Sequence, residues 1–214
     1  MRLRIVLNAL ISFTNASALG QRASAAIPSA NASTWAPETK NPHFFTIRVD
    51  EKCTAGQWAS ACPFAGYAIR LLNEKAVATP YNQWWDPKLP MFFVDSNTKT
   101  YTASKQPLQF YINTVDGSLH YSQIGGLPAA SNATDFSTTG DNPQGLVAPS
   151  PSYFLWNSTG PKASPSTAGT WWLCPMPGTG NYQVYSGDSN VDGGASKKDC
   201  VRKKLAAVDA NPFN

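Results

Sequence analysis

Apolar and polar side chains alternate in short runs from residue 44 onward. In the run 44–49, Phe45, Ile47 and Val49 fall on one face and the intervening residues fall on the other. Because neighbouring side chains of a strand point to opposite faces, this spacing predicts a strand and not a helix. Comparable runs predict strands at 67–71, 91–94, 108–113, 119–121, 153–156, 170–174 and 182–185.

The segment 108–121 has the clearest hairpin pattern. Phe110 and Ile112 alternate with more polar residues, and Asp116-Gly117 then supplies a turn. Glycine and the short Asp side chain tolerate the positive φ values that tight hairpin turns require. The pattern therefore predicts two antiparallel strands joined by this turn.

Turn residues separate the short runs, and helical periodicity is almost absent, which predicts an all-β fold. A single antiparallel β-sandwich and a barrel-like domain with long loops both fit the pattern, and we favour the sandwich. The C-terminal segment is ambiguous. Val201, Leu205 and Val208 could line a short helix, or Val201 could begin a last strand.

The start of the chain has the features of an export signal. A basic tip precedes the largely apolar run 5–13, which is followed by small residues. This order predicts a secretory signal peptide at residues 1–20, and the apolar run is shorter than the roughly 20 residues of a membrane span. Residues 21–41 then predict a flexible arm rich in Ala, Ser and Pro, and residues 42–214 a single β-rich domain. With no later apolar run of spanning length, we expect a secreted protein, extracellular or in a cell wall.

Cysteine usage agrees with export. Four cysteines in an exported chain predict two disulfides, for which three pairings exist. We favour Cys53–Cys62 and Cys174–Cys200, because each pair is close in sequence and closes a loop within one supersecondary unit.

Three Asn-x-Ser/Thr motifs follow the predicted signal peptide. They place N-glycosylation acceptors at Asn31, Asn132 and Asn157. Such motifs are glycosylated in exported proteins, so we expect a glycoprotein.

The charge balance is modest. Seventeen Lys and Arg residues oppose thirteen Asp and Glu, a formal net charge of +4. This balance predicts no nucleic-acid binding. The basic stretch 197–204 is interrupted by Asp199 and Cys200, which favours a solvated face over a patch for an anionic polymer.

Residues that could carry catalysis are sparse. Ser189 lies in a Gly-Asp-Ser block, but no histidine follows it to act as its base. Glu74 and Asp86 are the best carboxylate pair for glycoside cleavage, although their sequence contexts favour surface carboxylates near turns. We therefore expect no catalytic residue and no cofactor, with a carbohydrate-active hydrolase as the less favoured alternative.

One segment has the spacing of a calcium-binding EF-hand loop, with oxygen ligands at Asp188, Asn190, Asp192 and Asp199. Its last position is Asp instead of the longer Glu, and no helical pattern precedes it. Asp, Asn and Gly are also the common residues of hairpin loops. We favour an ordinary turn and predict no metal site.

Two adjacent tryptophan pairs, Trp84-Trp85 and Trp171-Trp172, are the best candidates for ligand contact. On a strand, one member of each pair would point to the core and the other outward. An outward indole can stack on the apolar CH face of a sugar, and polar residues such as Asn82 lie beside the first pair. The alternative, in which all four rings fill the core or cover loops, is the commoner arrangement for tryptophan.

The hairpin 108–121, the block Trp171-Trp172-Leu173-Cys174-Pro175, the stretch 181–185 and the final Cys200 resemble PhiA-like fungal cell wall proteins. The resemblance spans roughly residues 43 to 210. It implies a secreted, glycosylated ascomycete protein of the cell wall, from a family in which some members are IgE-binding allergens. The family supplies no catalytic residues to carry over.

These observations lead to one main hypothesis and two alternatives. The main hypothesis is a secreted, non-catalytic fungal glycoprotein that has a structural role or associates with wall polysaccharide. The first alternative is an effector-like or antigen-like module that binds a protein through the same aromatic surface. The second is a carbohydrate-active enzyme.

Overall fold

The computed structural model describes residues 38–40, 42–51, 53, 61–139, 152–157, 169–187 and 199–211. The predicted signal peptide, almost all of the predicted arm, and Asn31 lie outside the described residues. The strands are β1 (Phe45–Val49), β2 (Tyr67–Leu72), β3 (Lys75–Pro80), β4 (Phe92–Val94), β5 (Thr100–Thr102), β6 (Leu108–Asn113), β7 (Leu119–Gln123), β8 (Ser131–Asn132), β9 (Phe136–Thr139), β10 (Ser152–Trp156), β11 (Thr170–Pro175), β12 (Tyr182–Ser186) and β13 (Val201–Asp209).

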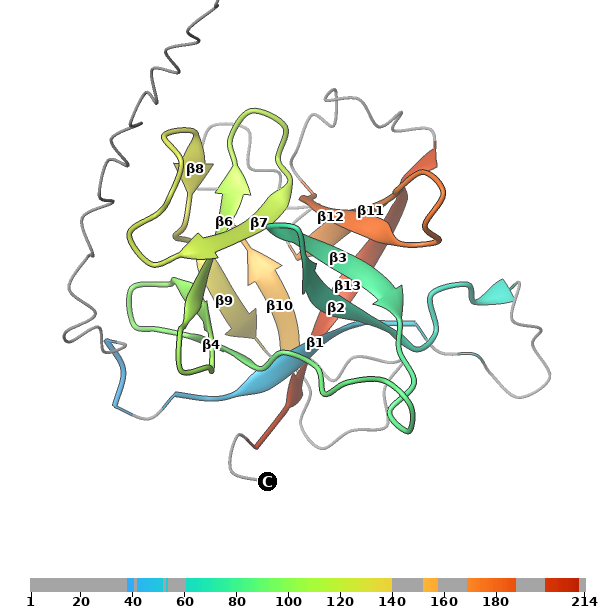
Figure 1. Ribbon diagram of the computed structural model, residues 1–214, viewed down its shortest axis with the longest axis horizontal. Coiled ribbons are helices and arrows are strands. Elements are labelled where there is room, and N and C mark those ends of the chain that lie inside the picture. The colour runs from blue at the N-terminus through green and yellow to red at the C-terminus, as the bar shows by residue number, and fades with distance from the viewer. Residues whose placement is uncertain are drawn as a thin grey trace, which may run out of the picture. The chain divides into compact units, whose positions relative to one another are not determined.

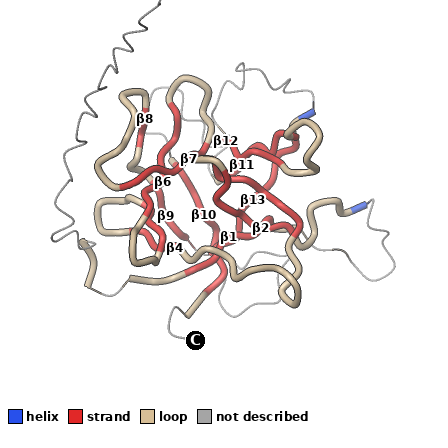
Figure 2. Tube along the Cα trace, in the orientation of Figure 1, coloured by secondary structure: helices blue, strands red, loops and turns tan. Residues whose placement is uncertain are grey.

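The all-β prediction is confirmed, and the barrel alternative describes the sheet (Figure 1). Every strand pair is antiparallel, and pairing runs in the order β2-β1-β4-β5-β6-β7-β3-β12-β11-β13-β10-β9. Additional pairings of β2 with β3 and of β1 with β13 close the sheet into a barrel of nine strands with further strands outside it. In the described residues, helix is confined to isolated short turns (Figure 2).

The period-two pattern explains which side chains fill the barrel. In β1, Phe45, Ile47 and Val49 are buried and the residues between them are half-buried, as predicted. Alternate positions of β13, Leu205 and Ala207, belong to the same hydrophobic core. The two strands pair over five residues. Burying one face of each strand against the opposite wall provides the main driving force for closure.

The C-terminal segment is a strand over its nine residues, so the helix alternative is wrong. Strand β13 pairs with β1, β10 and β11, which supply partners for backbone groups on both of its sides. The apolar spacing of Leu205 and Ala207 suits this sheet environment. The sequence of this segment is compatible with a helix and with a strand, and long-range pairing therefore decided its conformation.

Strand β3 was not predicted from the sequence. Its residues Ala76, Val77, Ala78 and Thr79 are all buried, so no alternation of apolar and polar side chains marks the strand. Strands buried on both faces have near-continuous apolar or small residues instead. β3 pairs with β2, β7 and β12 and so joins separate parts of the barrel wall.

Both favoured disulfides are present. Cys53 pairs with Cys62, and Cys174 pairs with Cys200, which leaves no free cysteine in the described part of the chain. The second bridge packs with Tyr185 in a small cluster separate from the main core. Across the described ranges, no helix is long and apolar enough to cross a membrane.

Candidate functional site

The Trp84-Trp85 pair lies in the connection between β3 and β4. Both indoles are exposed, Trp84 by 79% and Trp85 by 85%. The expectation of one inward and one outward ring is wrong for this pair, because the two residues lie in a turn and not in a strand. The backbone carbonyl of Asn82 accepts hydrogen bonds from the amides of Trp85 and Asp86, which curls the chain at this point. The turn therefore directs both rings to the surface.

Side-chain hydrogen bonds hold this turn in place. Asn82 Oδ1 accepts a bond from the Trp84 amide at 2.9 Å, and Asp86 Oδ2 accepts one from the Asn82 amide at 2.7 Å. The same Asp86 oxygen lies 3.1 Å from Arg70 Nη2, which ties the turn to strand β2. A loop that is already ordered loses less conformational entropy when its side chains bind a ligand.

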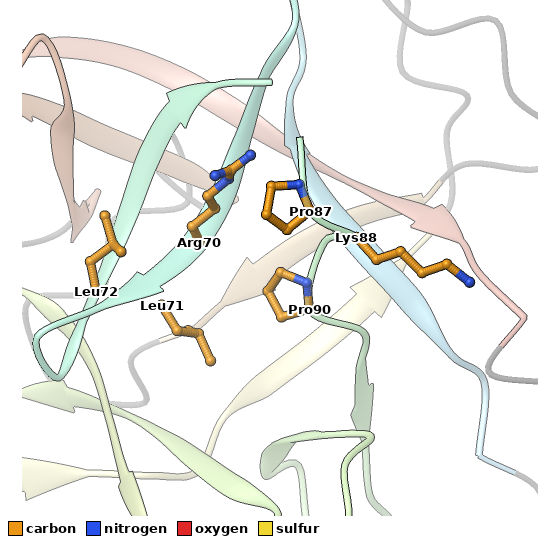
Figure 3. A pocket seen from close by; sticks show the side chains of 6 residues that line it. All are labelled: Arg70, Leu71, Leu72, Pro87, Lys88 and Pro90. Carbon is orange, nitrogen blue, oxygen red and sulfur yellow. The ribbon is translucent and has the colours of Figure 1, made fainter. Parts of the chain in front are cut away.

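A pocket of about 280 Å³ lies beside this turn, between β2 and the segment 87–90 (Figure 3). Its walls are mainly apolar, and the Arg70 guanidinium lies beside the Pro87 ring, whereas the Lys88 side chain extends away (Figure 3). The lining residues are Arg70, Leu71, Leu72, Pro87, Lys88 and Pro90. The pocket and the two indoles thus belong to the same loop region.

The second tryptophan pair follows the predicted in-and-out arrangement. Trp171 is 1% exposed, stacks on Phe154 at 5.4 Å, and donates its Nε1–H to the Phe154 carbonyl. It is a core residue whose ring cannot reach a surface ligand. Trp172 is half-buried, packs against the Cys174–Cys200 cluster, and lies 4.4 Å from the Arg202 guanidinium carbon. Of the four tryptophans predicted as candidates for ligand contact, Trp84 and Trp85 are therefore the exposed ones.

Two of the predicted glycosylation acceptors are described. Asn157 is exposed at the end of β10. Asn132 is half-buried, and its Oδ1 accepts bonds from the Thr134 amide and hydroxyl at 2.9 and 3.0 Å. The acceptor and the threonine of this motif are therefore in direct contact.

Most of the suggested calcium loop, including Asp188, Asn190 and Asp192, lies outside the described residues, and Asp199 is exposed. Among residues that the structure places, no group of three His, Cys, Asp or Glu could hold a metal ion. The two carboxylates considered for glycoside cleavage lie in different loops. Glu74 lies in the β2–β3 turn with a φ of 63°, and Asp86, in the connection between β3 and β4, lies at ion-pair distance from Arg70.

A polar cluster that sequence reasoning missed lies at the β6–β7 turn. Ser118 Oγ is 2.6 Å from Asp116 Oδ1 and 2.8 Å from His120 Nε2. His120 Nδ1 lies 3.0 Å from the Glu74 carbonyl. Because a carbonyl only accepts, Nδ1 carries the proton of the neutral ring. The single hydroxyl proton of Ser118 is donated to the Asp116 carboxylate. The spacing Asp-x-Ser-x-His, with all three on one face, is the signal that could have revealed it.

The cluster resembles a nucleophile–base pair, but its surroundings give it a structural role. Ser118 is 0% exposed, so its hydroxyl is closed to a substrate. His120 also stacks on Tyr111 with 5.5 Å between ring centroids, and the Ser186 amide donates to the Gly117 carbonyl. These contacts join the β6–β7 turn to the β2–β3 turn and to β12.

Stability is expected to fall in acid because of His120. Burial lowers the pKa of His120, against the raising effects of the Glu74 carbonyl and the Asp116 carboxylate. The unfolded chain, with a histidine pKa of about 6.5, then binds the proton more readily than the folded chain. The contribution of neutral His120 to stability is fully present above about pH 6.5. It decreases as the pH falls through this value toward the lower pKa that His120 has in the folded protein.

Thermal unfolding between about pH 5 and pH 8 measures this effect. His120→Gln is expected to flatten the acid side of the profile, whereas His43→Gln, a change at an exposed ring, preserves it. A parent protein whose melting temperature does not change across this range would contradict the assignment.

No family model, curated protein or solved structure matches the chain. Within the described residues, the Trp84-Trp85 turn and its surroundings are the strongest candidate for a functional site.

Proposed function

We propose that this protein is an exported, non-catalytic module that associates with polysaccharide of a fungal cell wall or extracellular matrix through Trp84 and Trp85. The observation that carries the proposal is the exposure of two adjacent indoles, 79% and 85%, on a turn fixed by hydrogen bonds. Large aromatic rings are normally buried, and contiguous exposed apolar groups mark binding surfaces.

The chemistry of the turn suits sugar rings. An indole offers a flat apolar face to sugar CH groups and an N–H that can bond a hydroxyl. The neighbouring Asn82 and Gln83 are exposed and provide amide groups for further hydroxyls. The combination of stacking and polar contacts would orient a polymer without a catalytic group.

Support for export comes from several sources. Two disulfides are typical of an oxidising compartment. The predicted signal peptide, the acceptors Asn132 and Asn157, and the resemblance to PhiA-like proteins favour the same location. Intact mass measurement of the secreted protein, before and after enzymatic removal of N-glycans, tests both cleavage and glycosylation.

A protein partner is the second candidate. Tryptophan is enriched at the centres of protein interfaces, and the pocket beside the turn is lined by Leu71, Leu72, Pro87 and Pro90. Such apolar walls would accept an aliphatic side chain of a partner.

The double substitution Trp84→Ala/Trp85→Ala is expected to weaken binding to insoluble β-glucan or chitin by about a hundredfold, since truncating a central tryptophan commonly costs tenfold or more. Because both rings are exposed, the melting temperature should not change. Polymer pull-down at graded protein concentrations measures the affinity. Val115→Ala, at a residue that is 80% exposed outside this turn, is the matched control.

Equal retention of the parent and the double variant on both polymers would refute the tryptophan site. If the folded parent binds no polysaccharide, neutral or acidic, the protein-partner alternative becomes the better explanation.

A further inference from the structure

Four cations lie on the outside of the barrel wall across neighbouring strands. Arg48, Arg70, Arg202 and Lys204 alternate along β1, β2 and β13 with side chains that point into the core. Strand β1 pairs with β2 at Arg48 and with residues 205–209 of β13. Lys204 and Arg202 lie on the same face of β13, just beyond that stretch, where β13 pairs with β11. We call the four cations the outer cationic face. Lys203, by contrast, is half-buried and paired with Glu51.

Each of these cations lies against an aromatic ring. The Arg48 and Arg70 guanidinium carbons lie 5.5 and 5.8 Å from the centroid of Tyr81. Arg202 and Lys204 lie 4.4 and 4.6 Å from the rings of Trp172 and Tyr153. Stacking on a ring face attracts a cation and fixes its position at the sheet surface.

In the part of the chain that the structure describes, two carboxylates contact this face of four cations. Asp86 lies at ion-pair distance from Arg70, and Asp50 accepts a hydrogen bond from the Tyr153 hydroxyl at 3.1 Å. Within the described residues, Arg48 has no ion pair, and its Nε is buried without a hydrogen-bond acceptor. Arg70 Nη2 is close to Asp86 without meeting hydrogen-bond geometry. Of the two guanidiniums near the Tyr81 ring, Arg70 thus has a carboxylate at ion-pair distance, and Arg48 has none among the described residues.

The cations and the exposed indoles are parts of one structure. Tyr81 lies in the same loop as Trp84 and Trp85, and Asp86 of that loop pairs with Arg70 of β2. A polymer stacked on the tryptophans would therefore pass close to Arg48 and Arg70. Guanidinium groups bind carboxylate and sulfate oxygens through charge-assisted hydrogen bonds.

We infer that the ligand of this surface is an acidic polysaccharide, whose carboxylate or sulfate groups are bound by Arg48 and Arg70 on Tyr81 and, farther along, by Arg202 and Lys204. The inference rests on the proposed function and adds the class of polymer to it. A nucleic acid would also meet cations and aromatic rings, but the expected extracellular location favours a glycan.

The test compares polygalacturonate with its methyl ester, which share a backbone and differ in charge, and adds dextran sulfate as a polymer that carries sulfate groups. Polygalacturonate, its methyl ester and dextran sulfate are titrated with the parent protein at low ionic strength and at about 1 M NaCl, where the Debye length is about 3 Å. We expect the acidic form to bind at least about tenfold more tightly than the ester at low salt, with most of the difference lost at high salt. Dextran sulfate distinguishes sulfate from carboxylate recognition.

Arg48→Gln is expected to weaken binding to the acidic polymer by about tenfold and to leave binding to the ester unchanged. If Arg48→Gln does not fold, the double variant Arg202→Gln/Lys204→Gln, at two exposed residues, is tested in its place. It is expected to weaken binding to the acidic polymer and to leave binding to the ester unchanged. Lys105→Gln removes one exposed positive charge from the β5–β6 loop and is the matched control.

The outcomes separate the two proposals. Equal affinity for the acid and the ester, or no effect of the arginine and lysine variants, overturns the acidic ligand even if Trp84→Ala/Trp85→Ala abolishes binding to neutral polymers. Loss of binding in the cation variants but not in the tryptophan variant retains the anion site and overturns the tryptophan platform. Single-stranded DNA that competes as well as polygalacturonate overturns the choice of a polysaccharide.

Discussion

Phe154→Ala is expected to lower the free energy of unfolding by about 4 kcal/mol. Phe154 is fully buried in β10, and Trp171 stacks on it with an interplanar angle of 4°. Its ring also lies within 5.6 to 6.3 Å of the rings of Phe45, Phe110 and Phe136. Truncation would remove these contacts and leave a cavity that rigid β-strands cannot collapse to fill.

Urea unfolding followed by tryptophan fluorescence measures this change. Phe154→Leu, which retains much of the volume, is expected to lose less than half as much stability. A loss below about 1 kcal/mol for Phe154→Ala would show that this ring is not central to the barrel core.

Removing the Cys174–Cys200 bridge is expected to cost about 3.5 kcal/mol, because an open chain regains the entropy of a loop whose ends are 26 residues apart. The bridge joins the end of β11 to the start of β13 and packs against Tyr185 and Trp172. Cys174→Ala/Cys200→Ala avoids placing hydroxyl groups at buried positions. Denaturant unfolding of the oxidised parent and the variant gives the difference.

The other disulfide provides an internal comparison. Cys53 and Cys62 are only nine residues apart, so Cys53→Ala/Cys62→Ala should cost less, about 2.6 kcal/mol. A larger loss at this bridge than at Cys174–Cys200 would contradict the loop-length explanation.

Local features of the sequence determined much of the strand structure. The alternation in β1 identified the buried face of Phe45, Ile47 and Val49, and all three are in the core. The hairpin of β6 and β7 follows from its alternation and its Asp116-Gly117 turn, with Gly117 at a φ of 77°. Sequence proximity was sufficient to pair the cysteines, because a short loop brings its ends together at low entropic cost.

The tertiary structure decided which of these local elements became neighbours. Closure of the barrel depends on the pairing of β1 with β13, which lie at opposite ends of the domain and whose register no local pattern specifies. Strand β3 has no alternating pattern because both of its faces are buried. The orientation predicted for Trp84-Trp85 was wrong because the pair lies in a turn, where Asn82 Oδ1 accepts a hydrogen bond from the Trp84 amide.

The outer cationic face likewise depends partly on local sequence and partly on tertiary structure. Alternation along β13 placed Arg202 and Lys204 outside the core, as the sequence alone could suggest. The long-range register of β13, β1 and β2 brought them onto the same side of the barrel wall as Arg48 and Arg70. Folding also placed both of these guanidiniums near the Tyr81 ring. Periodicity specifies the face of a strand on which a side chain lies, whereas the residues beside it depend on pairings between distant segments.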